Sequence, residues 1–295
     1  MNSPSVYVIT PAFNDERHVA RFLASVRYQT YKNLTMILID DGSTDNTSET
    51  AKRVWPSIVI LEGDGNLWWA GSTNKGVNYA LAKKADYILT VNIDVELDKK
   101  CVENLVTDLE KLPKTLLGSM VCDINNKDKV WYFGGYWDRQ KGDLKHTTGN
   151  LDQMGNEIRH PEWLTGMGLL IPAESFRQVG EYDGKNFPQY FADADFSLRC
   201  RMAGYKLSVS PKAIVYADLS SSWLENWLAR PRLSFFWNLF TSRRSQYNVK
   251  KRFTFYRKYW GNGYIKALFR LYFIGLSDLY KLWAVLYIKR LAGRT

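Results

Sequence analysis

Short apolar runs alternate with segments of helical spacing through the first 120 residues of the chain. The apolar runs are rich in β-branched side chains, which is typical of buried strands. The segments between them repeat apolar residues every three or four positions, which predicts amphipathic helices. The predicted strands are Val6–Ile9, Met36–Asp40, Ile58–Leu61, Tyr87–Val91 and Leu116–Met120, and the predicted helices are Glu16–Gln29, Thr44–Val54, Asn74–Lys84 and Lys99–Leu112.

This alternation of strand and helix predicts a mostly parallel, twisted sheet with helices on both faces. Open sheets of this kind bind their ligands beyond the carboxyl ends of the strands. We therefore expect the functional residues to follow directly after strands.

The second half of the chain is less regular. Aromatic, glycine-rich and aspartate-rich sequence between Trp131 and Asn156 predicts short strands and loops. After it we predict a strand at Leu164–Ile171, helices at Ala173–Val179 and Ala194–Ala203, and short strands to Tyr216. Helical spacing dominates from Trp223 onward, so the expected domains are residues 1–220 and 221–295.

Composition narrows the class of protein. With 295 residues and 45% hydrophobic content, the chain is able to bury a large core, and extended disorder is excluded. The 40 Lys and Arg residues against 30 Asp and Glu residues give a formal charge of +10, which favours an anionic partner such as a nucleotide diphosphate or lipid head groups. The basic residues concentrate after residue 230 without a DNA- or RNA-binding motif, so nucleic acid is not an expected partner.

Cysteine content and the N-terminus bear on the compartment. The three cysteines are Cys101, Cys122 and Cys200, an odd number without metal-type spacing, which argues against a disulfide framework or structural zinc. The N-terminus lacks the pattern of a signal peptide. No stretch approaches the roughly 20 uninterrupted apolar residues needed to cross a bilayer. We expect a cytoplasmic protein.

The segment Tyr264–Ala292 combines apolar residues with a narrow polar stripe at helical spacing. Two interpretations remain open: helices at a membrane interface, or helices that pack on the rest of the chain or on another subunit. The stripe is Lys266, Arg270, Ser277 and Lys281, and the apolar residues are Leu268, Phe269, Leu271, Tyr272, Phe273, Leu276, Leu279, Leu282, Trp283 and Leu286.

Two polar segments follow the first two predicted strands: Thr10–Asn14, and Asp40–Asp45, which reads Asp-Asp-Gly-Ser-Thr-Asp. Aspartate is a preferred helix cap, so capping of the next helix explains one carboxylate. A pair exceeds what capping requires. The second carboxylate is therefore a candidate acceptor for the imide N–H of uracil or thymine.

A third segment, Asn92-Ile93-Asp94, follows the strand that begins at Tyr87. A carboxylate at this place is able to bind a divalent metal that bridges two phosphates. A turn or helix-cap aspartate is the alternative.

A fourth segment, Phe191–Arg199, opens a predicted helix with Asp193 and Asp195. The helix dipole stabilises an anion at such a start, which makes Asp193 a candidate general base. Asp195 is four residues before Arg199 and is able to form an ion pair with it, as an organiser of the helix.

Together, the order and spacing of these four segments resemble the inverting family 2 glycosyltransferases over residues 5–220. The resemblance implies the GT-A fold, an α/β, Rossmann-like, mostly parallel central sheet flanked by helices, here with a C-terminal amphipathic helical appendage. It also implies that Asp193 is the catalytic base and that Asp94 binds the metal. The residues implied to bind the nucleotide-sugar are Thr10, Pro11, Asn14, Asp41, Asn66, Trp69, Gly71, Asn74 and Asn92, and those implied to lie at the acceptor or donor sugar are Trp163, Thr165, Gly166 and Asp195.

Three departures from the family pattern stand out. Asn92 replaces the first aspartate of the fullest metal motif, and Ala192 replaces the glutamate that usually precedes the base. No histidine follows the last strand, so Asp218 is the candidate substitute as a metal ligand. His18, His146 and His160 fall outside every motif and are interpreted as ordinary surface or loop residues.

The resemblance implies an inverting transfer of a sugar from a UDP- or dTDP-sugar to a hydroxyl of a growing, lipid-linked surface glycan, assisted by Mg²⁺ or Mn²⁺. The implied location is peripheral, at the inner face of the cell membrane, and a homo-oligomer remains open. The alternative function is a non-catalytic scaffold that binds a sugar nucleotide or a glycan.

Overall fold

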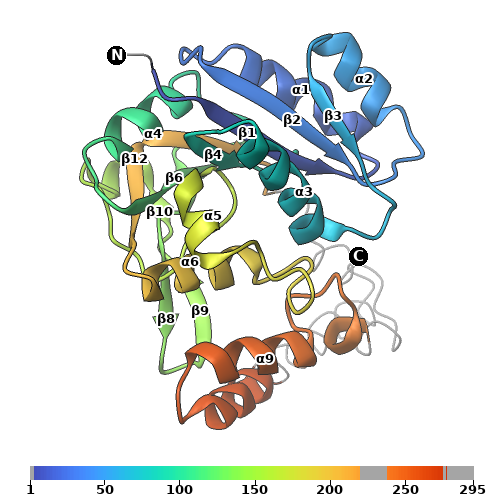
Figure 1. Cartoon of the computed structure of the whole chain (residues 1–295). Coiled ribbons are helices and arrows are strands. Elements are labelled where there is room, and N and C mark those ends of the chain that lie inside the picture. The colour runs from blue at the N-terminus through green and yellow to red at the C-terminus, as the bar shows by residue number, and fades with distance from the viewer. Residues whose placement is uncertain (1–2, 220–237, 275–276, 278–295) are drawn as a thin grey trace, which may run out of the picture. The chain divides into compact units, whose positions relative to one another are not determined.

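The computed structural model describes residues 3–219, 238–274 and 277 (Figure 1). They belong to two compact units. Unit 1 comprises residues 1–136 and 146–219, and unit 2 comprises residues 137–145 and 220–295. The predicted positions Leu276, Leu279, Lys281, Leu282, Trp283 and Leu286 lie outside the described residues.

Unit 1 is built on a ten-stranded sheet within the described residues. Its N-terminal part is parallel, in the order β4-β1-β2-β3. These strands span Val6–Ala12 (β1), Leu34–Asp40 (β2), Val59–Glu62 (β3) and Tyr87–Thr90 (β4). Their central residues, such as Val8, Ile37 and Leu89, are fully buried, as expected for a sheet covered on both faces.

The remaining strands make the sheet mixed rather than parallel throughout. β11 runs antiparallel between β4 and β6, whereas β12 runs parallel to β6 and antiparallel to β5. β7 pairs antiparallel with β6 and with β10. These strands span Val95–Leu97 (β5), Thr115–Asp123 (β6), Lys129–Tyr132 (β7), Gly149–Asn150 (β10), Leu169–Pro172 (β11) and Lys206–Ala217 (β12).

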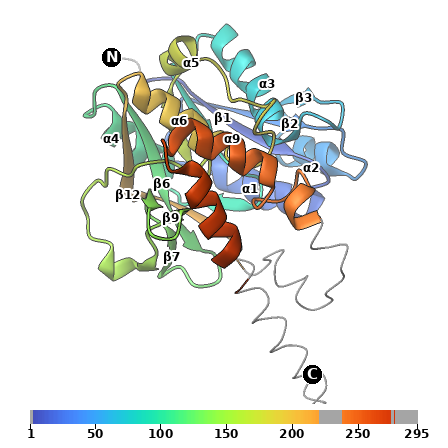
Figure 2. The same ribbon diagram turned by 90° about the horizontal axis from the view of Figure 1, so that it is seen from below.

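Helices cover both faces of the parallel strands. Figure 2 shows β1 and β2 between α3 on one side and α1 with α2 on the other. α1 turns Val19, Phe22 and Leu23 inward, which is the apolar stripe that the sequence predicts. The helices of unit 1 are α1 (Glu16–Arg27), α2 (Thr47–Val54), α3 (Trp68–Ala82), α4 (Cys101–Leu109), α5 (Ala173–Val179), α6 (Ala192–Met202) and the 3₁₀ helix η1 (Leu151–Gln153).

Most elements differ from their predicted bounds by a few residues at the ends, and three differ more. α3 begins at Trp68 rather than Asn74, because its first turn is fixed by contacts with distant residues. The strand predicted from Leu164 begins at Leu169, since Gly168 takes a φ of +81° that interrupts extended backbone. The predicted short strands before Tyr216 form a single strand, β12, with a register shift between Ser210 and Ile214.

Unit 2 contains most of the hairpin of β8 (Gly135–Asp138) and β9 (Asp143–His146), helix α9 (Val249–Tyr259) and a helix over residues 264–274. Trp137 contacts Phe255 and Trp260, with ring centroids 5.8 and 5.0 Å apart, and forms the aromatic core of this unit. Among the described residues of the whole chain, no helix is both long and apolar enough to span a membrane. All three cysteines are buried and free.

Candidate functional site

The predicted site residues gather at one edge of the sheet of unit 1. The carboxyl ends of β1 and β2 lie side by side there, because Ala12 pairs with Asp40. β11 starts at the same edge, since it runs antiparallel to β4 and Leu169 pairs with Thr90. The segments that follow β1, β2 and β4 and the segment that precedes β11 are therefore neighbours, as expected from the topology.

Asp41 holds the loop that leads from β3 into α3. One oxygen, Oδ1, accepts hydrogen bonds from the backbone N–H groups of Gly65 and Leu67, at 3.0 and 3.3 Å. The other, Oδ2, accepts from the N–H of Trp68 at 2.9 Å. The carboxylate is only 6% exposed. Asp41 thus has an architectural role, and its contact with a nucleoside base remains a prediction that uses the remaining acceptor capacity of its oxygens.

Glycine at position 63 makes this contact with Asp41 feasible. A Cβ atom there would lie 2.4 Å from Asp41 Oδ1 and 2.9 Å from Leu67 Cδ1. Any larger residue would force the carboxylate away from the loop. Asn66, in contrast, has an exposed side chain at the tip of the same loop.

The other polar groups after β1 and β2 hold the two loops together. Asp40 accepts a hydrogen bond from the N–H of Ser43 at 2.8 Å and one from the Ser48 hydroxyl. The predicted capping of the next helix by this aspartate is wrong, because α2 follows Asn46 and has no side-chain hydrogen bond at its N-cap. Asn14 Oδ1 accepts from the N–H of Thr44 at 2.8 Å. Thr10 is fully buried, and its hydroxyl has no hydrogen-bond partner within the described parts of the chain.

Trp69 connects three of the predicted segments. Its indole Nε1–H donates to Asn92 Oδ1 at 2.9 Å. The edge of the same ring lies against Gly166, where an added Cβ would approach it to 2.7 Å. Tyr182 packs edge-on at a centroid distance of 5.2 Å. The ring is used in packing and positioning between protein groups in this structure.

Asn74 and Gly71 also face protein groups rather than open space. The Asn74 amide donates to the carbonyl of Tyr182 at 2.8 Å and accepts from the N–H of Tyr182 at 2.9 Å. Gly71 is close to the backbone of Gly184, because an added Cβ at 184 would lie 3.6 Å from the Gly71 nitrogen. These contacts tie α3 to the segment that leads toward α6.

Asp94 and Asp218 face each other across the end of a strand pair. β12 and β5 are antiparallel, with Ala217 opposite Val95, so the next residues in register are Asp218 and Asp94. Both side chains are exposed. The Asn125 amide donates to Asp218 Oδ1 at 3.5 Å. Like charges at directly opposite positions repel each other, and a cation between them would relieve this repulsion.

The surroundings of Asp94 raise the pKa of its carboxyl group. Neighbouring protein displaces water around the carboxylate and makes the largest contribution, and the negative charges of Asp15 and Asp218 act in the same direction. A protonated His18 nearby opposes them. His18 Nδ1 lies 3.3 Å from Asp15 Oδ1. His18 therefore belongs to the surroundings of the site, although no sequence motif includes it.

The carboxylates at this strand end fit a divalent cation that is shared with a ligand. The described residues contain no group of three or more His, Cys, Asp or Glu side chains able to hold a metal by themselves. Mg²⁺ and similar ions in phosphate-transfer sites are commonly held by one or two carboxylates plus substrate phosphates. Asp94 and Asp218 supply this kind of donor set, with oxygen ligands only.

Asp193 lies at the first turn of α6, beside Gly166. Its Oδ2 accepts from the N–H of Gly166 at 2.9 Å, its Oδ1 accepts from the N–H of Ala194 at 2.8 Å, and the Thr165 side chain adds a further hydrogen bond. Phe191, the residue before α6, is held at a φ of +72°, a conformation that is strained for an aromatic side chain and sets where the helix begins.

Burial raises the pKa of Asp193 despite these donors, because loss of water around the carboxylate outweighs the hydrogen bonds that stabilise the anion. The role of Asp193 as general base, predicted from its place at the helix start, stays a prediction. A carboxylate with a raised pKa is a stronger base, which suits a group that removes a proton from a hydroxyl.

Tyr132, at the end of β7, supports the strand segment that contacts Asp193. It is fully buried, and its hydroxyl donates to the carbonyl of Trp163 at 3.1 Å and accepts from the N–H of Thr165 at 3.3 Å. The Trp163 ring packs over Gly135, where a Cβ would lie 2.1 Å from the indole. Tyr132 belongs to no motif, and its position after a short strand is the only sequence signal for it.

The predicted ion pair between Asp195 and Arg199 is confirmed, with Arg199 Nε 2.8 Å from Asp195 Oδ2. Arg199 also donates to the carbonyls of Val179 and Glu181, at 2.7 and 2.6 Å. The Asp195 side chain is fully buried and acts here as an organiser of α6, whereas its contact with a sugar stays a prediction.

A pocket of about 560 Å³ lies at the opposite edge of the sheet. Its lining includes Tyr87 and Thr115, which begin β4 and β6, and Pro172, which ends the antiparallel β11. It shares no residue with the site described above.

Comparison with known proteins agrees with this arrangement. The chain is 24% identical to N-acetylglucosaminyl-diphospho-decaprenol L-rhamnosyltransferase of Mycobacterium tuberculosis, over 70% of this chain and 74% of that protein. Its structure is similar to that of the mannosyltransferase PcManGT from Pyrobaculum calidifontis in complex with GDP-Man and Mn²⁺, with a TM-score of 0.60, 14% identity, and coverage of 99% and 76%.

A second solved structure, GalNAc-T7 with UDP, GalNAc and Mn²⁺, has a TM-score of 0.61 and 18% identity and covers 74% of this chain. This chain spans 44% of the length of that one. Both structural neighbours are GT-A glycosyltransferases, so the fold is confirmed as GT-A. Residues 7–157, just over half of the chain, match the family described as glycosyl transferase family 2. The chain therefore belongs to glycosyl transferase family 2 and is a glycosyltransferase.

Proposed function

We propose that the protein is an inverting glycosyltransferase that moves a sugar from a nucleotide diphosphate to a hydroxyl of a lipid-linked surface glycan. The observation that carries this proposal is the placement of Asp193. Its carboxylate is fixed by Gly166 and Ala194, has a raised pKa, and belongs to the same sheet edge as Asp94 and Asp218.

The proposed reaction is a single displacement. Asp193 takes the proton of the acceptor hydroxyl, whose oxygen forms a bond to the anomeric carbon of the donor sugar. The bond between that carbon and the phosphate oxygen breaks, and its electron pair leaves with the nucleoside diphosphate. Attack from the face opposite the leaving group inverts the anomeric configuration. Orientation of donor and acceptor supplies much of the acceleration, and the base contributes on the order of 100- to 10,000-fold.

Asp94 and Asp218 are the residues that would hold a divalent cation, Mg²⁺ or Mn²⁺, next to the donor phosphates. A bound cation supplies charge neutralisation of the leaving diphosphate. Both structural neighbours carry Mn²⁺ in their complexes, which supports a cation in this chain without choosing between the two metals.

The donor class is proposed to be a UDP- or dTDP-sugar, read through Asp41, and the acceptor class is taken from the rhamnosyltransferase relative, whose name specifies a polyprenyl diphosphate acceptor. We place the protein in the cytoplasm, at the inner face of the cell membrane, where such an acceptor is exposed.

Replacement of Asp193 by Asn tests the proposal. We expect Asp193→Asn to lose transfer by at least about 100-fold, because Asn accepts no proton, while the donor still raises the unfolding temperature. Asp152→Asn changes an exposed aspartate of η1 and is the matched control, with unchanged transfer. Turnover that survives in Asp193→Asn would remove this residue from the role of base.

A screen of donors addresses both the substrate and the alternative function. UDP-, dTDP- and GDP-sugars, each with and without Mn²⁺, are compared for protection against thermal unfolding. We expect protection by uracil or thymine nucleotides, stronger with Mn²⁺. A wild-type chain that binds a donor but transfers to no acceptor in a broad panel would be a sugar-nucleotide-binding scaffold.

A further inference from the structure

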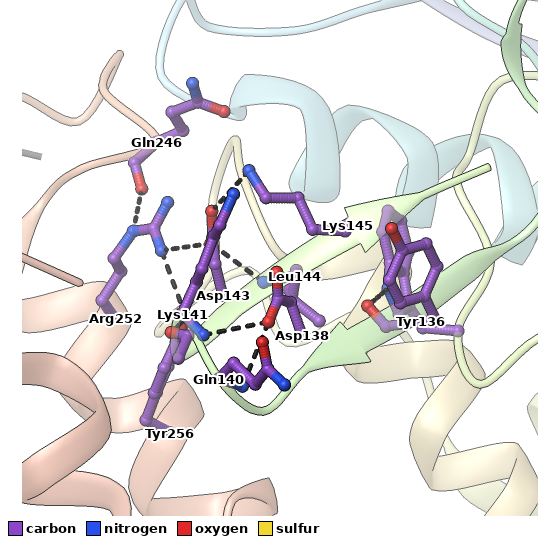
Figure 3. A network of polar contacts seen from close by, with 12 residues as sticks. Tyr136, Asp138, Gln140, Lys141, Asp143, Leu144, Lys145, Gln246, Arg252 and Tyr256 are labelled. Atoms are coloured by element: carbon purple, nitrogen blue, oxygen red, sulfur yellow. Dashed lines mark hydrogen bonds and ion pairs between the residues drawn. The ribbon is translucent and has the colours of Figure 1, made fainter. Parts of the chain in front are cut away.

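Helix α9 and the helix over residues 264–274 both contact the β8–β9 hairpin on one side. Arg252 of α9 donates to Asp143 Oδ1 at 3.0 Å, and the Tyr256 hydroxyl donates to the carbonyl of Gly142 at 2.7 Å (Figure 3). Gly142 also lies against the helix over residues 264–274, because an added Cβ would be 2.6 Å from the carbonyl oxygen of Ala267. The buried side of this unit is thus already occupied by its own hairpin.

The opposite side of the helix over residues 264–274 exposes large apolar side chains. Ile265, Phe269 and Phe273 are 65%, 71% and 66% exposed, and they recur every four residues along one stripe. The Phe269 and Phe273 rings stack at a centroid distance of 6.0 Å. We call this stripe, with its neighbours Lys266 and Arg270, the basic aromatic face. Side chains of this size are seldom exposed together on a protein that has no partner there.

The two sides of the helix over residues 264–274 differ in burial. Leu268 and Leu271 are buried, as packing requires, whereas Phe269 and Phe273 are not. The helix therefore has an apolar side toward its own unit and a second apolar side toward solvent.

The charged side chains of residues 238–274 have a single sign. Residues 238–274 contain no Asp or Glu. Lys266 and Arg270 lie on the face itself and are exposed. The Phe253 ring of α9 contacts Tyr264 at 5.6 Å, so the exposed side of α9 adjoins the face. The other exposed basic residues of this part of the chain are Arg243, Arg244, Lys250, Arg257 and Lys258.

We propose that the basic aromatic face is a docking surface for a bilayer that carries anionic lipid head groups. Aromatic and aliphatic side chains enter the interfacial region of a bilayer, while Lys and Arg remain beside the phosphates. Each basic residue close to such a surface adds attraction that salt weakens. An acidic protein would complement the charge, but it offers no comparable apolar layer for Ile265, Phe269 and Phe273, which are each about two-thirds exposed. Membrane binding is independent of the proposed transfer reaction, and each is measurable when the other fails.

Vesicle flotation of the full chain tests the proposal. The probes are vesicles of phosphatidylcholine alone and of phosphatidylcholine mixed with phosphatidylglycerol. We expect the wild-type chain to float with the mixed vesicles and to be released as NaCl is raised. Phe269→Ser with Phe273→Ser should weaken the partitioning about 100-fold, because two phenyl rings lose their interfacial burial.

Two further variants separate the contributions. Lys266→Gln with Arg270→Gln should weaken binding to the mixed vesicles about tenfold or more and leave binding to phosphatidylcholine unchanged. Tyr28→Ser with Met202→Ser removes two side chains of unit 1 that are 72% and 78% exposed, and this control should bind like the wild type. Unchanged thermal unfolding of all variants verifies that they fold.

Three results would overturn the proposal. The first is absence of wild-type flotation with either kind of vesicle, and the second is flotation that the phenylalanine variant does not reduce. The third comes from sedimentation velocity: a wild-type dimer that Phe269→Ser with Phe273→Ser turns into a monomer, without a change in vesicle binding, would assign the face to a second copy of this chain.

Discussion

Aspartates follow strands in two regions at the same edge of the sheet, and the two regions differ in burial and in hydrogen bonding. Asp41, after β2, accepts bonds from three backbone N–H groups and is almost completely buried. Asp94, after β4, and Asp218, after β12, are exposed and face each other. The comparison teaches that aspartates in similar motifs differ in how much of the carboxylate is taken up by backbone N–H groups, and that Asp41 is held far more tightly than Asp94 or Asp218.

The strongest test of this distinction is Asp94→Asn. We expect transfer to fall on the order of 1000-fold, since the proposed cation site loses one of its two carboxylates. Stability in the absence of ligand should stay the same or increase at neutral pH, because Asp218 loses a like-charged neighbour. Initial rates across a series of Mn²⁺ concentrations, together with thermal unfolding, measure both effects. Full activity at ordinary Mn²⁺ concentrations would contradict the assignment.

For Asp41→Asn, in contrast to Asp94→Asn, we expect a clear loss of stability in the absence of ligand. Charge-assisted hydrogen bonds to three backbone N–H groups are weakened, and one of these groups faces an amide NH₂ that cannot accept, so the free energy of unfolding should drop by about 2–4 kcal/mol. Urea denaturation measures this loss. Asp152→Asn serves as the control for removal of an aspartate, and a loss of stability below about 0.5 kcal/mol for Asp41→Asn would show that the loop does not depend on this carboxylate.

Trp69→Phe tests the connection between the loop held by Asp41 and the segment that contains Asn92 and Asp94. The variant keeps an aromatic ring against Gly166 but loses the 2.9 Å hydrogen bond to Asn92. We expect a decrease in kcat/KM of about tenfold, the value of one hydrogen bond whose half-buried partner is left unpaired. Trp55→Phe, at a half-buried indole whose N–H donates to Ser57 far from the candidate site, should leave kcat/KM unchanged.

The smallest effect is expected from Tyr132→Phe, and it lies in the pH dependence. The raised pKa of Asp193 places the acid limb of kcat/KM above the ordinary range of aspartate, and activity falls as pH decreases through that pKa. Loss of the Tyr132 hydroxyl loosens the segment that supplies Thr165 and Gly166 to Asp193. The pKa should then rise further, and the acid limb should move to higher pH.

A change in kcat/KM at every pH without a shift of the acid limb would assign Tyr132 a purely structural role.

The pH dependence of wild-type stability independently tests whether the pKa values of Asp94 and Asp193 are raised in the folded chain. Asp94 and Asp193 bind protons more tightly in the folded chain than in the unfolded chain. Their contribution to the free energy of unfolding therefore decreases as pH rises from the ordinary aspartate range through their raised pKa values.

Sequence periodicity was sufficient to predict the helices and strands that depend on the local pattern of apolar residues. Helix Ala173–Val179 matches its predicted bounds, and the first strands differ from theirs only at the ends. Periodicity did not predict the ends of elements that are fixed by contacts with residues far away in the sequence. The first turn of α3, which includes Gly71, has little intrinsic helix preference, and it forms because Asp41 and Gln189 accept the N–H groups of Trp68 and Trp69.

The candidate site was predictable as a set of segments but not as a set of roles. Motif order identified Asp94 and Asp193, because both directly follow points where strands and loops end. The fixed positions of Asp41 and Asn74 depend on backbone groups of other segments, which no local pattern reveals. Tyr132 and His18 became visible only through the contacts of their side chains.

Under the proposed function, the loop between β3 and α3 restricts which positions are able to change the donor preference. Gly63 and Leu67 are constrained by contact with one buried oxygen of Asp41, so most replacements there disturb the loop before they reach a ligand. Asp64 and Asn66 are exposed, and the Asn66 N–H donates to Asp64 Oδ1 at 2.9 Å. A library aimed at new donor preferences is best confined to these two positions, where variation is compatible with an intact scaffold.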